Sequence, residues 1–390
     1  MKSSAIKRFT LVIIATLNIL QTMLPIKSSA ADSKECAVYF GTGTHGKSKG
    51  IYLGILNQET GALSQPVLAA LTSNPGFLDI STNGKYLYAT GGSAMVDGKQ
   101  SDTAVAFAID RKTGLLTELN TVSTVGQGPC HILLDKTSSI AMVANYGSGS
   151  LVSFPIGKGG KLGEASSFFQ NNGKSINQGR QEGPHAHGFA VDPYNHFAYA
   201  CDLGIDKVLI FHIDTKAKKL VPNEIPFFSI KPGSGPRHIT FRPDGKFVYV
   251  VNELTSTVTA ASVDANTGGL NEIQTISMLP SDFTQISSAA EIACHPSGKF
   301  LYASNRGHDS IAVFAIDPAT GKLESIQHQS TLGKTPRGFG VDPSGNFLIV
   351  ANQDSENVTV MRIDQDTGKL QPVGNPLTVC AGMCVLFQQL

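Results

Sequence analysis

A sequence phrase that recurs every 46 to 55 residues constrains the fold more than any other feature of this chain. Each copy has an apolar segment, a turn rich in Pro, Ser, Asp and Gly, and a second apolar segment that ends in Asn or a small residue. Residues 239–252 and 294–305 are the clearest copies. The starts of six copies are marked by Pro75, Pro129, Pro184, Pro236, Ala290 and Pro336. Repetition at this period predicts a chain built from similar supersecondary units.

A second phrase follows several copies of the first, and consists of an alternating apolar segment, an Asp and a Thr-Gly-x-Leu motif. Residues 105–116, 311–323 and 358–370 carry it. Alternation of apolar and polar residues is typical of strands, and Asn-Gly and Asp-Gly pairs favour tight hairpin turns. Together the two phrases predict four antiparallel strands in each unit. The 40 glycines among 390 residues fit a chain with many turns.

Units of four antiparallel strands at this spacing stack radially as the blades of a β-propeller. Six units are complete in the sequence, and a seventh would combine residues 383–387 as its inner strand with three strands from residues 36–63. Pairing the two ends of the chain closes the ring and protects strand edges that otherwise invite aggregation. We therefore predict an all-β fold, a seven-bladed β-propeller closed by N- and C-terminal strands, with residues 32–390 forming a single domain.

The first 31 residues predict a cleaved signal peptide rather than part of this domain. Lys2, Lys7 and Arg8 precede the mostly apolar residues 9–24, and the small residues at 28–31 are suited to cleavage. An uncleaved anchor is the alternative, but a membrane-spanning helix needs about 20 apolar residues. No other segment has the length and apolar character of a membrane span. We expect the mature chain to be exported, to the periplasm or outside the cell.

Charge and cysteine content narrow the function classes. The formal net charge of the whole chain is +1, so the sequence has no basic domain that would bind nucleic acid. Removing the signal peptide leaves 27 basic and 30 acidic residues. Export allows disulfides, and all six cysteines lie beyond residue 31. Their scattered spacing contains no C-x-x-C pair of the kind found in zinc sites, and it predicts no particular pairing.

Candidate functional residues gather where the predicted first strand of each blade begins and the second strand ends. These positions lie on one face of a propeller, because the two strands are antiparallel neighbours. The strand starts carry His131, His185, His187, Arg237, His238, Glu291 and Arg337, and the strand ends carry Asn145, Tyr146, Asp202, Glu253, Arg306 and Gln353. Three of the seven arginines and four of the ten histidines beyond residue 31 therefore surround one channel mouth.

These residue types suit anion binding and acid–base chemistry. Arg binds carboxylate or phosphate groups through two parallel hydrogen bonds, and His titrates near neutral pH. Three histidines on one face could instead hold a metal ion, but the acidic residues here do not outnumber the arginines, which repel cations. We therefore predict no metal and no cofactor. For each residue, an ordinary role in hydrogen bonding between blades is the structural alternative.

Several of these segments resemble one known family. The resemblance rests on residues 38–42 and 49–52, on Gly-Pro-His-Ala-His at 183–187, and on Gly-Pro-Arg-His at 235–238. It rests also on Val-Asn-Glu-Leu at 251–254, Ser-Asn-Arg-Gly at 304–307 and Cys-Val-Leu-Phe at 384–387. Essentially the whole mature chain resembles the lactonase family of seven-bladed propellers. That family contains the cycloisomerase-like 6-phosphogluconolactonases and the fungal carboxymuconate cyclases.

The resemblance implies metal-independent hydrolysis of a sugar lactone, with His187, Arg237, Glu253 and Arg306 as the catalytic residues. Arg237 and Arg306 would hold the anionic group and the carbonyl oxygen of the substrate. Glu253 or His187 would deprotonate the attacking water, and the other would protonate the leaving ring oxygen. The remaining members of the cluster are expected to bind the substrate: His131, His185, His238, Glu291 and Arg337.

The expected partner is a small anionic lactone or sugar acid, and the sequence leaves the oligomeric state open. Two alternatives to hydrolysis also stay open. The same arginines could bind a muconate-like diacid for ring-forming cycloisomerase chemistry, or the propeller could bind a ligand or a protein without catalysis.

Overall fold

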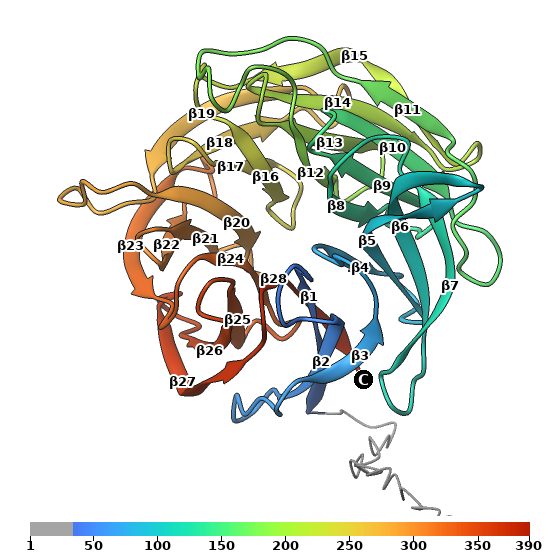
Figure 1. Cartoon of the computed structure of the whole chain (residues 1–390). Helices are drawn as coiled ribbons and strands as arrows, with labels where there is room; N and C mark the ends of the chain where they lie inside the picture. Colours follow the sequence, from blue (N-terminus) through green and yellow to red (C-terminus); the bar gives the residue numbers. More distant parts are fainter. Residues whose placement is uncertain (1–33) are drawn as a thin grey trace, which may run out of the picture.

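The computed structural model describes residues 34–390 as 28 β-strands arranged in seven four-stranded antiparallel sheets (Figure 1). The sheets form the blades of a propeller, which confirms the predicted fold class. The first strands of successive blades contact one another around the centre of the ring. Within residues 34–390 no helix is long and apolar enough to cross a membrane. The predicted signal peptide, residues 1–31, lies outside the described residues.

Each blade runs from an inner first strand to an outer fourth strand. Blade 1 comprises β28 (Gly382–Gln389), β1 (Glu35–Thr42), β2 (Gly50–Asn57) and β3 (Val67–Leu71). Blade 2 comprises β4 (Leu78–Ile80), β5 (Tyr86–Val96), β6 (Lys99–Ile109) and β7 (Leu116–Ser123). Blade 3 comprises β8 (Pro129–Leu134), β9 (Ile140–Asn145), β10 (Ser150–Pro155) and β11 (Ser167–Gln170). Blade 4 comprises β12 (Ala186–Val191), β13 (Phe197–Asp202), β14 (Lys207–Asp214) and β15 (Lys219–Ser229).

The remaining three blades repeat this order without a split. Blade 5 comprises β16 (Pro236–Phe241), β17 (Phe247–Asn252), β18 (Thr257–Val263) and β19 (Leu270–Ser277). Blade 6 comprises β20 (Ser288–Cys294), β21 (Phe300–Arg306), β22 (Ser310–Ile316) and β23 (Leu323–Ser330). Blade 7 comprises β24 (Pro336–Val341), β25 (Phe347–Asn352), β26 (Asn357–Ile363) and β27 (Leu370–Thr378).

Blade 1 joins the two ends of the chain, as the repeat predicted. Strand β1 pairs antiparallel with the C-terminal strand β28 on one side and with β2 on the other. The sequence predicted that residues 36–63 supply three strands of this blade, but this range ends before the third of them begins. Leu63 makes only an isolated bridge with Leu56, and the outer strand β3 begins at Val67. Pro66 has no N–H to donate, so the regular ladder with β2 starts directly after it.

A repeated tyrosine contact links neighbouring blades. In five interfaces, a buried tyrosine on the second strand of one blade donates a hydrogen bond to a glycine carbonyl oxygen in the next blade. The pairs, 2.8–3.2 Å apart, are Tyr39–Gly114, Tyr88–Gly160, Tyr199–Gly268, Tyr249–Gly321 and Tyr302–Gly368. Each glycine lies in the turn between the third and fourth strands, which explains the recurrent Gly of the second phrase.

Gly321 shows why this position excludes a side chain. Its φ of +71° is a conformation that residues with a Cβ rarely adopt, and an added Cβ would lie 2.4 Å from Cδ1 of Phe247. The blades otherwise meet through apolar side chains. Between blades 5 and 6, Val251 packs in one buried cluster with Leu301 and Phe314. All six cysteines are free thiols in the structure.

We expect Gly321→Ala to lower the free energy of unfolding by about 2–4 kcal/mol, because it adds overpacking against Phe247 to the cost of a left-handed backbone. Gly98→Ala is the matched control: its φ is +75°, but no atom lies within 4 Å of the added Cβ. The control substitution should lower the free energy of unfolding by only about 1–2 kcal/mol. Urea unfolding midpoints measure both, and equal shifts would contradict the proposed role of this blade contact.

Candidate active site

The start of each first strand is paired with the end of the second strand, so both lie on one face of the ring. Pro129, Ala186, Pro236 and Pro336 face Asn145, Asp202, Asn252 and Asn352 in the registers of their blades. The ladder then skips one residue of the first strand. The skipped residues are Cys130, His187, Arg237 and Arg337, and blade 6 skips Ala290 and Glu291. Such bulges re-aim side chains, and apart from Ala290 every skipped residue carries a polar or ionisable side chain.

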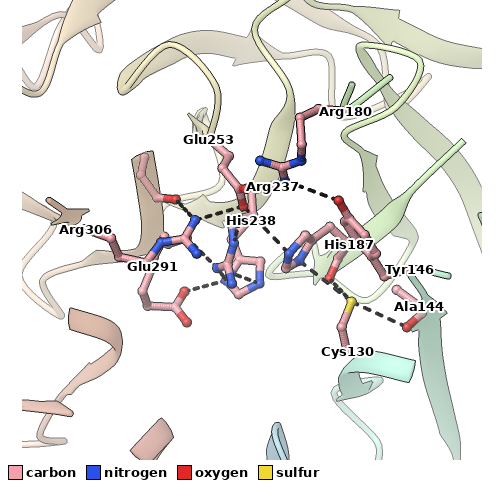
Figure 2. Close-up of polar contacts among 12 residues, drawn as sticks. Cys130, Ala144, Tyr146, Arg180, His187, Arg237, His238, Glu253, Glu291 and Arg306 are labelled. Carbon is pink, nitrogen blue, oxygen red and sulfur yellow. Dashed lines mark hydrogen bonds and ion pairs between the residues drawn. The ribbon is translucent and has the colours of Figure 1, made fainter. Parts of the chain in front are cut away.

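Glu253, which directly follows β17, lies at the centre of an arginine cluster (Figure 2). Its Oε1 accepts a hydrogen bond from Nη2 of Arg180 at 2.6 Å. Its Oε2 lies 3.0 Å from both Nε of Arg237 and Nη2 of Arg306. The carboxylate is 5% exposed and its pairs with Arg237 and Arg306 are shielded from water, whereas Arg180 is 42% exposed. Charge-assisted hydrogen bonds of this kind are short and directional, and they hold the guanidinium groups in place.

The arginines keep Glu253 ionised. Burial by itself opposes ionisation, but the charges of Arg237, Arg306 and Arg180 outweigh it and lower the pKa of the carboxyl to about 2. Arg306 is less favourably placed: burial and the neighbouring charge of Arg237 lower its pKa below the usual value. At neutral pH, Glu253 is therefore a charged hydrogen-bond acceptor with very low basicity.

His187 lies beside this cluster and is buried between Glu253 and Cys130. Its Nε2 is 4.0 Å from Oε2 of Glu253, and its Nδ1 is 3.8 Å from Sγ of Cys130. Burial, followed by the charges of Arg237, His238 and Arg337, lowers the pKa of His187 well below its usual value. The imidazole is consequently neutral at pH 7 and has a lone pair that can accept a proton.

A cavity of about 440 Å³ opens at the same mouth. Four of the nine residues predicted to be catalytic or substrate-binding line it: His187, Arg237, His238 and Arg337. The rest of the wall comes mainly from blades 1 to 3 and 7, and consists of Thr42, Gly43, His45, Gly46, Asn74, Gly76, Phe77, Pro129, Cys130, Gln353, Ala381 and Met383. The other five of the nine, His131, His185, Glu253, Glu291 and Arg306, are not part of this wall. The cavity is of the size that binds small molecules.

His238 has a carboxyl partner deeper in the ring. Its Nδ1 is 2.8 Å from Oε1 of Glu291, whose pKa is raised to about 7 by burial, against the opposing charge of Arg237. The His238 ring packs edge-on against His131 and His187, with ring centroids 5.0 and 5.1 Å apart. His131 in turn packs on Phe77 at 4.0 Å. His131 and Glu291 therefore support the cavity wall without belonging to it.

His185 lies apart from the cavity wall. Its ring stacks on Tyr146 with centroids 4.5 Å apart, its Nδ1 is 3.0 Å from the Tyr146 carbonyl oxygen, and its Nε2 is 3.2 Å from Glu182. Because His185 is not part of the cavity wall, the cavity gives no support to the prediction that His185 binds the substrate directly. Within residues 34–390, no three His, Cys, Asp or Glu side chains are grouped as metal ligands would be.

Sequence reasoning missed Arg180. This residue lies in the long loop between β11 and β12, where the repeat gives no register, yet it contacts both Glu253 and the hydroxyl of Tyr146 at 3.2 Å. The one available signal was its rarity, because only seven arginines follow residue 31. With Arg180 included, four guanidinium groups surround the mouth: Arg180, Arg237, Arg306 and Arg337.

Comparison with known proteins identifies the family. A family model described as lactonase, 7-bladed beta-propeller, matches residues 37–387. The 6-phosphogluconolactonase of Bacillus subtilis is 39% identical over 304 residues, which cover 78% of this chain and 84% of that protein. A solved protein of Bacteroides fragilis has a TM-score of 0.85 and 34% identity, covering 93% of this chain and all of that one.

The solved periplasmic gluconolactonase of Pseudomonas aeruginosa has a TM-score of 0.84 and 28% identity, covering 90% of this chain and 99% of that one. Fold, end-to-end coverage and sequence identity agree with the family model. The chain therefore belongs to the family of seven-bladed β-propeller lactonases.

Proposed function

We propose that this protein is a lactonase that hydrolyses a sugar lactone to the sugar acid, with 6-phosphoglucono-lactone as the leading substrate. One observation carries the proposal: a neutral, buried His187 and a rigidly held Arg237 line the same cavity. A base and a fixed cation side by side are what acyl transfer to water requires. The relatives named 6-phosphogluconolactonase and gluconolactonase support this choice of substrate class.

In this mechanism, His187 accepts a proton from water as the water oxygen attacks the lactone carbonyl carbon. The carbonyl oxygen becomes an oxyanion, and Arg237 stabilises its charge. The tetrahedral intermediate then collapses, the bond between the carbonyl carbon and the ring oxygen breaks, and His187 returns its proton to the ring oxygen. Water has then been added across the ester bond, and the histidine is neutral again.

The structure supports His187 rather than Glu253 as the base, a choice that the sequence left open. Glu253 has a pKa of about 2, hydrogen bonds to three arginines, and no place in the cavity wall. It acts instead as a positioning residue that fixes Arg237. Arg306, which donates to the Ala289 carbonyl oxygen at 2.7 Å, is held from the same carboxylate.

We expect His187→Ala to lower kcat for lactone hydrolysis by about 10²- to 10⁴-fold, because it removes the general base. The melting temperature should stay close to that of the wild type. His196→Ala is the control, because His196 is exposed in the turn between β12 and β13, on the opposite face. A pH-stat measures acid release after subtraction of spontaneous hydrolysis. Wild-type kcat in a folded His187→Ala protein would refute the assignment.

Glu253→Gln tests the positioning role through stability. Because the folded-state pKa of Glu253 is depressed, its stabilisation is present above the ordinary pKa of 4.5 and is lost as pH falls towards 2. Because Glu253→Gln leaves three arginines without their carboxylate, it should lower the free energy of unfolding by about 3–5 kcal/mol at pH 7. Urea unfolding at pH 7 and pH 3.5 should therefore show a smaller pH dependence in Glu253→Gln than in the wild type.

The control for this comparison is Glu164→Gln, at an exposed position where both unfolding midpoints should stay unchanged. The kcat of Glu253→Gln should fall as well, since Arg237 loses its anchor. A Glu253→Gln protein with wild-type stability at pH 7 would show that the carboxylate does not hold the cluster together.

We also propose that the protein is exported after removal of residues 1–31. The charged, apolar and small-residue segments of this region support export, as does the periplasmic description of the Pseudomonas aeruginosa relative. Expressed with a C-terminal tag in a Gram-negative host, the full chain should appear in the periplasmic fraction with the mass of a cleaved protein. Deleting residues 2–31 should leave it in the cytosol. A full-length mass in the cytosolic fraction would contradict export.

A further inference from the structure

Arg337 differs from the other three arginines of the mouth, because its side chain has no hydrogen bond or ion pair within the described residues. Arg180, Arg237 and Arg306 each form an ion pair with Glu253, and Arg237 also donates to the Ala290 carbonyl oxygen at 2.6 Å. Among residues 34–390, nothing accepts a hydrogen bond from the Arg337 side chain or forms an ion pair with it. The guanidinium of Arg337 is therefore free to bind a ligand.

The position of Arg337 places this free cation in the cavity. It is the bulged residue of β24 and lines the cavity wall, as does Gln353, which directly follows β25. Burial, followed by repulsion from Arg237 and Arg306, lowers the pKa of Arg337 to about 10. Burial and the neighbouring arginines therefore both disfavour the positive charge of Arg337. An anion in the cavity would remove this penalty.

Arg337 and Arg237 come from different blades, 7 and 5, and both line the cavity. Arg237 is committed to Glu253, and after burial its charge has the largest effect on the pKa of His187. Arg337 is the cation left for another part of the ligand. The side-chain amides of Gln353 and Asn74 in the wall suit the hydroxyl groups of a sugar.

We propose that Arg337 binds an anionic substituent of the substrate, a phosphate or carboxylate group separate from the lactone carbonyl, and thereby selects charged lactones over neutral ones. The inference rests on the proposed lactonase function and assigns the residue that sets its substrate preference. A guanidinium can bind either group through two parallel hydrogen bonds, which a lysine ammonium cannot reproduce.

Binding of product analogues tests the proposal without requiring turnover. Calorimetry would compare 6-phosphogluconate and glucarate, which carry a second anionic group, with gluconate, which carries only the carboxylate formed from the lactone carbonyl. In Arg337→Gln, affinity for one or both doubly anionic ligands should fall about 10- to 100-fold, while that for gluconate changes less than about threefold. The ligand that loses affinity identifies the group as phosphate or carboxylate. Arg337→Lys should recover part of the loss.

Arg111→Gln is the matched control, because Arg111 is exposed and donates only to the Asn83 carbonyl oxygen on the opposite face. Removing the unpaired charge of Arg337 should leave the melting temperature unchanged or raise it. Equal losses for all three ligands, or no loss for any, would overturn the proposal. If the wild type binds 6-phosphogluconate through Arg337 but hydrolyses no lactone, the anion site stands and the proposed catalysis fails.

For the active enzyme, the same variant should raise KM for 6-phosphoglucono-lactone about 10- to 100-fold, with kcat much less affected. The kcat/KM for glucono-lactone, which has no phosphate, should stay within about threefold of the wild type. A parallel fall in kcat for both lactones would place Arg337 in the chemical step instead, and would also overturn its assignment to specificity.

Discussion

The candidate site depends on a single backbone constraint: the inner strand of a blade must pair with its neighbour and still direct a side chain into the centre of the ring. A bulge just after the start of the strand meets both demands. Blades 3, 4, 5 and 7 each skip one residue there, and these residues are Cys130, His187, Arg237 and Arg337. All four line the cavity. The tyrosine–glycine contacts join neighbouring blades at five interfaces and so help to fix the ring around these inner strands.

Charge is distributed unevenly around this ring. Glu253 gathers Arg180, Arg237 and Arg306 on the side of blades 4 to 6, and so neutralises part of their charge. Arg337, on blade 7, has no such partner within residues 34–390. The cavity wall therefore carries one cation that Glu253 holds rigidly, Arg237, and a second cation, Arg337, that forms no ion pair within residues 34–390. This asymmetry favours a ligand that has an anionic group in addition to its reacting carbonyl, and a net charge of +1 for the whole chain conceals it.

The sequence predicted the features that repeat and missed those that do not. The blade phrase predicted the ring, its closure and the convergence of His187, Arg237, Glu253 and Arg306. It placed the outer strand of blade 1 too early, because Pro66 delays the ladder. It could not reveal Arg180, which reaches Glu253 from an irregular loop. Nor could it choose between His187 and Glu253 as the base, since their pKa values depend on how many guanidinium groups surround each in space.

The most direct test of this account is hydrolysis by the purified mature protein, residues 32–390, followed as acid release in a pH-stat with EDTA present. The account predicts protein-dependent opening of 6-phosphoglucono-lactone that EDTA does not reduce, because a guanidinium rather than a metal ion stabilises the oxyanion. Loss of this activity on adding EDTA would contradict the assigned chemistry. So would the failure of a folded protein to open either this lactone or unphosphorylated sugar lactones.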